Sequence, residues 1–198
     1  MPAQHPFRLR AVASAALVAV AVLSACSCTP APATDASPPA SLGAAGDAMV
    51  ANTTIVRIVD GDTVVVALAD ADGHDEHVRL IGIDTPETKK PDTPVECFGR
   101  EASEHLHALL PDGTPVRVER DAEARDRYGR LLAYVYRASD GLFVNLAMVR
   151  DGFAAQLTVP PNVAHVDELG AAATTARQQQ KGLWSACTGP HVPAPDTG

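Results

Sequence analysis

Three short segments concentrate residue types that can act on a phosphate group. They read VDGDT over residues 59–63, VRLIGIDTPE over 78–87 and DRYGRLLAY over 126–134. Carboxylates and backbone carbonyls are the oxygen ligands that a hard divalent cation such as calcium prefers. Guanidinium groups can hold the charge that develops when a phosphodiester is attacked, and a carboxylate can orient or deprotonate the attacking water. Together the segments predict a site for metal-assisted cleavage of phosphodiester bonds.

Each segment taken alone has a purely structural explanation. Asp-Gly-Asp is a common hairpin turn, and Tyr-Gly-Arg suits a loop that enters a strand. Asp60 either supports a metal site indirectly or simply shapes this turn, and we favour the turn. Arg79 and Asp84 are five positions apart, an odd offset that strand alternation would send to opposite faces. Asp84 is therefore expected beyond the end of its strand.

Alternating β-branched residues predict the strands that must position these groups. Five strands are expected, the first three antiparallel, over residues 52–59, 63–68, 77–83, 114–120 and 130–137. Apolar residues at helical spacing predict about three helices, over residues 101–110, 143–150 and 163–181. Five strands in a meander with intervening and trailing helices predict an α+β fold, a five-stranded β-barrel of the OB type.

Length and charge limit the possible organisation. The chain has 198 residues and a formal net charge of −8. That length suits one domain, which we place at residues 49–187. Lys and Arg normally supply most of the sequence-independent affinity for nucleic acid. Any binding of nucleic acid by so acidic a chain must therefore be local, at a basic site or through a metal.

The N-terminal residues predict export. Residues 1–25 have the form of a signal peptide, with Arg8 and Arg10 before an uncharged apolar stretch. Leu-Ser-Ala-Cys, ending at Cys26, resembles the lipobox of bacterial lipoproteins, in which the cysteine carries the lipid. The alternative is an ordinary cleaved signal peptide with Cys26 incidental, and Cys28 has no assigned role. The protein is expected at the outer face of the cell membrane, lipid-anchored, or secreted.

Composition also predicts where the domain begins and ends, and the cysteines predict a disulfide within it. Residues 26–48 and 188–198 are rich in small and Pro residues without apolar periodicity, so we expect a disordered tether and a disordered tail. Cys97 and Cys187 remain inside the domain and are expected to form a disulfide in an exported protein. The alternative is two unpaired buried thiols.

In order and spacing, the three segments resemble the signature of the staphylococcal nuclease (thermonuclease) family, here in an exported lipoprotein form. The resemblance extends to ECFGREA at 96–102, VNLA at 144–147 and GLW at 182–184. It implies an OB-fold and a calcium-dependent endonuclease that hydrolyses single-stranded and double-stranded DNA and RNA to 3′-phosphorylated products. A monomer is the default expectation.

The resemblance also implies roles for individual residues. Arg79 and Arg130 would hold and polarise the phosphate, and Glu87 would be the general base or the group that orients water. The calcium ligands would be Asp62, Asp84 and the carbonyl of Thr85.

The sequence departs from the type member of the family at the substrate pocket. Residues 156–160 read QLTVP where that enzyme has pocket tyrosines. Base stacking on an aromatic ring contributes roughly 1 to 3 kcal/mol per base, so Tyr128 and Tyr136 are the remaining candidates for substrate binding.

Two functions from other classes compete with the enzyme. One is a non-catalytic OB-fold module that binds nucleic acid or protein, and the other is a structural scaffold of the envelope. Neither requires two arginines, a glutamate and two aspartates together, so the sequence favours a nuclease.

Overall fold

The structure is a computed structural model that describes residues 49, 51–67, 74–88, 94–187 and 189–194. The predicted signal peptide, Cys26 and the predicted tether lie outside these residues. In the described part of the chain, no helix is long and apolar enough to cross a membrane. Export and lipid attachment rest on residues outside the described part of the chain and stay predictions.

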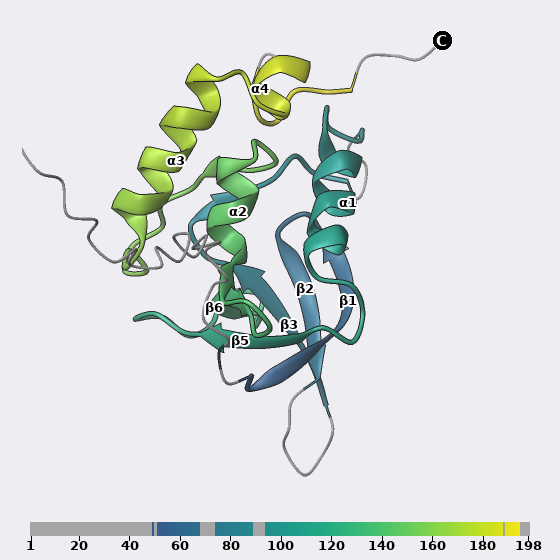
Figure 1. Cartoon of the computed structure of the whole chain (residues 1–198), viewed down its shortest axis with the longest axis vertical. Helices are drawn as coiled ribbons and strands as arrows, with labels where there is room; N and C mark the ends of the chain where they lie inside the picture. Colours follow the sequence, from purple (N-terminus) through teal and green to yellow (C-terminus); the bar gives the residue numbers. More distant parts are fainter. Residues whose placement is uncertain (1–48, 50, 68–73, 89–93, 188, 195–198) are drawn as a thin grey trace, which may run out of the picture. The chain divides into compact units, whose positions relative to one another are not determined.

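The strands form a closed barrel (Figure 1). Its five members are β1 (Thr53–Asp60), β2 (Thr63–Ala67), β3 (Asp75–Leu80), β5 (Pro115–Glu119) and β6 (Leu131–Arg137), and the short β7 (Leu142–Phe143) pairs with β6 outside the ring. Their order in the sheet is β3-β2-β1-β5-β6-β7, and an additional parallel pairing of β3 with β6 closes the ring. The predicted α+β class and five-stranded OB barrel are confirmed.

The pairing differs from a simple meander. After β3 the chain forms a helix and returns as β5 beside β1, and β6 then joins β5 to β3. A sheet of β1, β2 and β3 alone would expose unpaired N–H and C=O groups on both edges, and the hairpin of β5 and β6 covers both. Alternation predicts that a segment is a strand, but it does not reveal the strand's partner.

The predicted strand at 77–83 is interrupted by a turn. β3 ends at Leu80, and the chain turns at Gly82, whose φ of 80° is left-handed. The residues beyond form β4 (Ile83–Asp84), which pairs with β8 (Ala155–Gln156) in a separate antiparallel sheet. Asp84 thus lies beyond the end of β3, as the odd spacing from Arg79 required.

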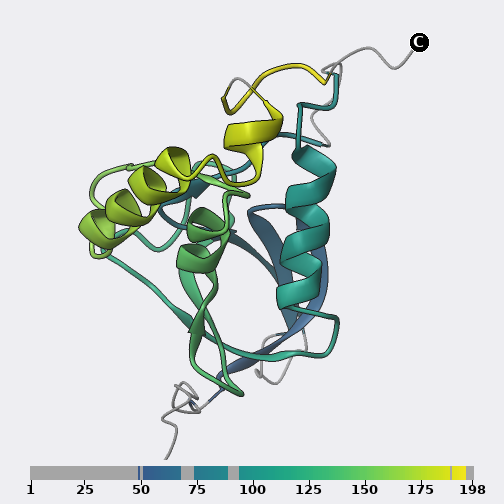
Figure 2. The ribbon, with the colours of Figure 1, turned by 45° about the horizontal axis from the view of Figure 1, so that its top comes forward.

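Four helices are present among the described residues, where about three were expected. They are α1 (Gly99–Leu109), α2 (Val144–Arg150), α3 (Val166–Gln178) and α4 (Leu183–Ala186). The additional helix, α4, has only four residues, too few to show a period in the sequence. α1 packs on β1 and α2, whereas α2 lies between β6 and α3 (Figure 2).

The core fills the space between the barrel and these helices. Side chains that point inward are completely or almost completely buried, among them Val64, Val78, Leu80, Leu106, Val135, Met148 and Leu169. Burying an aliphatic side chain of this size contributes about 1.5 to 3 kcal/mol. Because Val78 and Leu80 point inward, the residue between them, Arg79, points out of the barrel.

A disulfide joins Cys97, just before α1, to Cys187, just after α4, with an S–S distance of 2.02 Å. The following residues differ from the disordered tail predicted for 188–198. Residues 189–194 lie against the segment 95–97, with Cys97 N–H donating to Val192 O at 2.7 Å and Ala194 N–H donating to Val95 O at 3.1 Å. We call residues 189–194 the C-terminal strap.

Removing the disulfide should destabilise the folded protein. The bond closes a loop of 90 residues, and the loss of chain entropy in the unfolded state corresponds to about 4 to 5 kcal/mol as an upper figure. A Cys97→Ser, Cys187→Ser double variant should therefore unfold at a clearly lower urea concentration than the wild type, with an equal or steeper slope because the unfolded chain without the cross-link is less compact. Equal midpoints, or two free thiols in the oxidised wild type, would contradict this.

Candidate active site

Strand register brings the two predicted phosphate-binding arginines together. Arg79 of β3 lies opposite Thr63 of β2 on one side and Leu132 of β6 on the other. Arg130 precedes Leu132 by two positions and therefore shares its face of the sheet. Both arginines line a cavity of about 530 Å³ beside the turn between β1 and β2.

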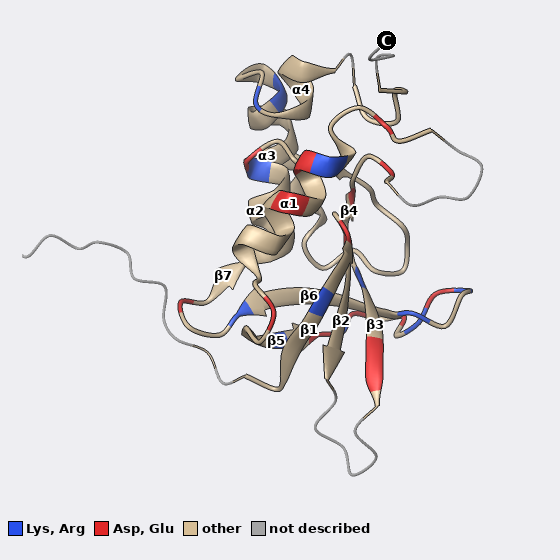
Figure 3. Cartoon of the chain, turned by 90° about the vertical axis from the view of Figure 1, so that its right-hand side faces the viewer, with Lys and Arg blue, Asp and Glu red and all other residues tan. Residues whose placement is uncertain are grey.

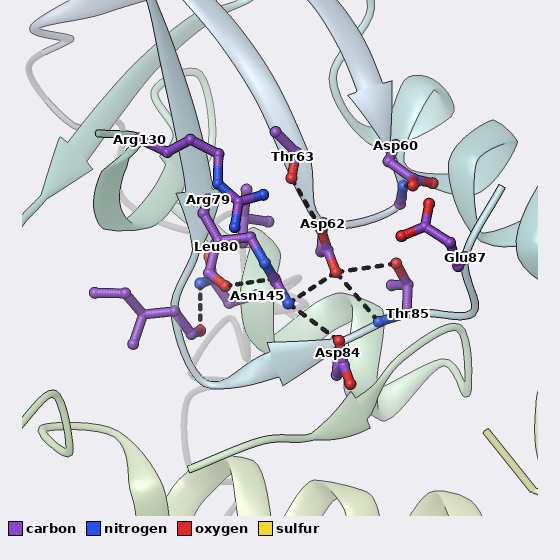
Figure 4. Close-up of polar contacts among 12 residues, drawn as sticks. Asp60, Asp62, Thr63, Arg79, Leu80, Asp84, Thr85, Glu87, Arg130 and Asn145 are labelled. Carbon is purple, nitrogen blue, oxygen red and sulfur yellow. Dashed lines mark hydrogen bonds and ion pairs between the residues drawn. The ribbon is translucent and has the colours of Figure 1, made fainter. Parts of the chain in front are cut away.

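Arg79 joins the two aspartates predicted to bind metal (Figure 4). Its Nη2 lies 2.9 Å from Asp62 Oδ2 and 3.1 Å from Asp84 Oδ1. Its Nη1 donates a hydrogen bond to Leu80 O at 3.0 Å. The side chain of Arg79 is only 13% exposed, so water screens these pairs little.

Asp62 is held by hydroxyl and amide donors as well. Its Oδ2 accepts hydrogen bonds from the Thr85 amide at 3.3 Å and the Thr85 hydroxyl at 3.2 Å, and its Oδ1 accepts one from the Thr63 hydroxyl at 2.9 Å. Gly61 permits this approach, because a Cβ there would lie 2.8 Å from Thr85 Oγ1. Asp62 and Thr85 are both buried.

Asp60 and Glu87 face one another on the opposite side of the turn (Figure 4). Burial raises the pKa of Asp60 to about 6, and a hydrogen bond with the Glu87 carboxyl adds to the shift. Asp60 Oδ1 also accepts hydrogen bonds from Gly61 N–H at 2.8 Å and from the Thr88 hydroxyl at 2.9 Å. Asp60 therefore contacts both the turn and the predicted base.

Arg130 is oriented by the loop before β6. Its Nε donates a hydrogen bond to Asp126 Oδ2 at 2.7 Å, and its guanidinium carbon lies 5.5 Å from the centre of the Tyr128 ring. That ring is 69% exposed. Charged residues of both signs are interspersed along this loop (Figure 3), so the positive charge at the site is local.

A second cavity of about 440 Å³ adjoins the first, and Arg79 and Arg130 line both. Tyr128, Leu157 and Val159 are among its other lining residues. Tyr136, the other tyrosine predicted to bind substrate, lines neither cavity. It stacks on Phe143 instead, with ring centres 4.8 Å apart.

The sequence reasoning missed His191 and included Glu96 only as part of a motif. His191 Nε2 lies 2.8 Å from Asp84 Oδ2, and its Nδ1 lies 2.8 Å from Glu96 Oε2. Burial lowers the pKa of His191, but the contacts with Glu96 and Asp84 outweigh this and raise it above its ordinary value. His191 lies in a Gly- and Pro-rich segment, and the only signal was its closeness in sequence to Cys187.

Asn145 was noted in the sequence only as part of a motif. Its buried side chain accepts a hydrogen bond from Val135 N–H at 2.9 Å and donates one to Ile81 O at 2.8 Å. It thereby connects β6 to the turn after β3, and so fixes the start of the segment that carries Asp84.

The donor set fits a hard cation in part. Among the described residues, no group of three or more His, Cys, Asp and Glu side chains is arranged to hold a metal ion. Asp62 and Asp84 nevertheless both present an oxygen to the same nitrogen of Arg79. Two convergent carboxylates suit a hard cation with water completing its shell, and Thr85 lines the same cavity. Burial raises the pKa of Asp84, Arg79 opposes this, and Asp62 adds to it.

Known proteins resemble this chain over most of the domain. Residues 77–186 match the family model described as staphylococcal nuclease homologue. The chain is 38% identical over 131 residues to the thermonuclease of Staphylococcus hyicus, covering 66% of this chain and 74% of that protein. It is 42% identical over 130 residues to the thermonuclease of Staphylococcus intermedius, with the same coverage. It is 37% identical over 136 residues to endonuclease YncB of Bacillus subtilis, covering 68% of this chain and 62% of that protein. The fold, the cavity and these similarities lead to one assignment: the chain belongs to the staphylococcal nuclease family.

Proposed function

We propose that this protein is a calcium-dependent nuclease that hydrolyses phosphodiester bonds in DNA and RNA and leaves 3′-phosphorylated products. The observation that carries the proposal is one cavity lined by Arg79, Arg130 and Glu87 together with Asp62 and Asp84. Relatives named thermonuclease and endonuclease support the nuclease activity in this proposal. A module that only bound nucleic acid would not need a carboxylate beside two mostly shielded arginines.

The residues divide the reaction between them. Water adds to phosphorus and the P–O5′ bond breaks, so that the phosphate stays on the 3′ side and the leaving 5′-oxygen takes up a proton from solvent. Glu87 accepts the proton of the water or orients it. Arg79 and Arg130 donate hydrogen bonds to the phosphate oxygens, where negative charge grows in the transition state. To do so, Arg79 exchanges its contacts with Asp62 and Asp84 for contacts with the phosphate.

Asp62, Asp84 and the carbonyl of Thr85 would hold the calcium ion. A bound calcium ion would supply positive charge that offsets the two carboxylates and the phosphate. The Thr85 amide and hydroxyl keep Asp62 in position, as described above.

The second cavity is suited to the part of the substrate next to the cleaved bond. It continues from Arg79 and Arg130 toward Leu157 and Val159, which are 39% and 57% exposed. Aliphatic side chains contact any base without reading hydrogen-bond patterns. Tyr128 is the aromatic ring of this cavity, and we assign the stacking contact to it.

We also propose that the protein is exported and anchored at the outer face of the cell membrane by lipid on Cys26. The support is the signal peptide pattern and the lipobox at residues 23–26. Mass spectrometry of the mature protein should find Cys26 as the first residue, carrying lipid. An unmodified N-terminus at another residue would rule the anchor out.

The nuclease proposal predicts a specific effect of Glu87→Gln. The purified protein should cleave single-stranded DNA, duplex DNA and RNA with calcium and lose activity with a chelator. Glu87→Gln should lower turnover by roughly 10² to 10⁴, the range for a lost general base, while DNA binding persists. Glu104→Gln, on the exposed face of α1, is the matched control. A Glu87→Gln, Arg130→Lys double variant that cleaves at the wild-type rate would place the chemistry elsewhere, and binding without cleavage by the wild type would indicate the non-catalytic module.

The Asp60 and Glu87 pair predicts a pH dependence of stability without metal. The pKa of Asp60 rises from 3.8 to about 6 on folding, so the folded protein holds this proton more tightly than the unfolded chain. The free energy of unfolding should therefore fall as the pH rises through that interval. Asp60→Asn keeps the acceptor for Gly61 and Thr88 and cannot ionise. Its melting temperature relative to the wild type should rise from pH 4 to pH 6 and then level off.

Thermal melts in chelator across this range measure the difference. Asp112→Asn, in an exposed loop, controls for the loss of a surface charge. If the difference in melting temperature between Asp60→Asn and the wild type stays constant with pH, the pKa of Asp60 is not raised on folding.

A further inference from the structure

The C-terminal strap brings a side chain into the candidate active site from outside the barrel. His191 is one of the residues that line the cavity with Arg79, Arg130 and Glu87. Its φ of 59° lies in the left-handed region that residues other than glycine rarely adopt. Such a conformation persists where surrounding contacts determine it, and here both ring nitrogens contact carboxylates.

The strap is fixed to the domain at several points. Residues 95–97 form hydrogen bonds with its backbone at Val192 and Ala194, and Glu96 forms an isolated antiparallel bridge with Pro193. The disulfide of Cys97 and Cys187 joins the same two regions covalently. Backbone hydrogen bonds and this cross-link together hold the segment that carries His191.

The contact with His191 decides which oxygen of Asp84 faces the predicted metal site. His191 contacts Oδ2 of Asp84, while Oδ1 faces the point where Arg79 Nη2 also meets Asp62. Carboxylates that bind metal are commonly oriented by a further hydrogen bond of this kind. If His191 instead occupied the position of the cation, it would lie between Asp62 and Asp84. No contact of His191 with Asp62 is found among the described residues.

Glu96 extends the arrangement to the predicted base. Its Oε2 contacts His191 Nδ1 and also accepts a hydrogen bond from the backbone N–H of Glu87, each at 2.8 Å. His191 and Glu96 thus connect the metal-binding aspartate to the backbone of the residue that would activate water.

We infer that His191 is a positioning residue of this site: held by the disulfide-linked strap, it orients Asp84 for binding of a divalent cation. The inference rests on the proposed calcium site. It adds a residue from the C-terminal strap to a site otherwise built from the barrel and its loops.

Calcium binding by the full-length protein, measured by titration calorimetry at one pH without substrate, tests this directly. His191→Ala should weaken calcium binding roughly 10- to 100-fold, the usual cost of removing such a partner. The melting temperature in chelator should change little, because the ring is 46% exposed. His107→Ala, an exposed histidine of α1, is the matched control and should bind calcium like the wild type.

Two further substitutions separate the contacts of the ring. The amide nitrogen of glutamine reaches about as far from the backbone as Nε2 of histidine, and that of asparagine about as far as Nδ1. His191→Gln keeps a donor for Asp84 and should recover most of the calcium affinity. His191→Asn keeps a donor only for Glu96 and should resemble His191→Ala.

A double-mutant cycle tests the role of the disulfide. Cys97→Ser, Cys187→Ser should weaken calcium binding to a similar degree, and adding His191→Ala should weaken it little further, because both changes remove the same contact. Additive losses would overturn the link between the disulfide and His191.

The outcomes distinguish this inference from the proposed function. If the wild type binds calcium, Asp62→Ala abolishes binding, and His191→Ala has wild-type affinity, the inference is wrong and the proposed site stands. Tighter binding by His191→Ala would mean that the strap competes with calcium, which also overturns it. If the wild type binds no calcium, the calcium part of the proposed function fails and the inference fails with it.

Discussion

The parallel pairing of β3 with β6 is the constraint on which the rest of this structure depends. It closes the barrel, so every central strand has two neighbours and the inward-pointing side chains form one core. The same register sets Arg79 opposite Leu132, which places Arg130 on the adjacent strand end and on the same outer face. A shift of one residue would turn one arginine toward the core and separate the pair. Stability and the candidate chemistry therefore rest on a single alignment of strands.

The site concentrates negative charge in a chain that is already acidic. Asp60, Asp62, Asp84, Glu87 and Glu96 line one cavity. Arg79 lies between two of these carboxylates, His191 lies between two, and the raised pKa of Asp60 lets it share a proton with its neighbour. Carboxylates held this closely repel one another, and a bound cation would relieve that repulsion. The net charge of −8 thus does not oppose a role on nucleic acid, because the relevant field is local.

The second cavity, next to Arg79 and Arg130, has aliphatic side chains where an aromatic pocket would have rings. Leu157 and Val159 offer apolar area without a ring, and the exposed ring of Tyr128 lies beside the guanidinium groups of Arg127 and Arg130. In the proposed function, such a surface would contact the sugar and base while Arg79 and Arg130 would hold the phosphate. Contact with the backbone rather than the base is consistent with the proposed action on both DNA and RNA.

The sequence by itself determined the local elements and the residue types of the site. Alternation predicted five strands, and the odd spacing of Arg79 and Asp84 showed that Asp84 lies beyond the strand, because both follow from repeats of a few residues. Only the tertiary structure decided which strands pair, that Tyr136 lies away from the cavity, and that His191 enters it. These depend on contacts between segments distant in sequence. Such contacts are set by closure of the barrel and by the Cys97–Cys187 cross-link. From composition alone, the segment that carries His191 resembled a disordered tail.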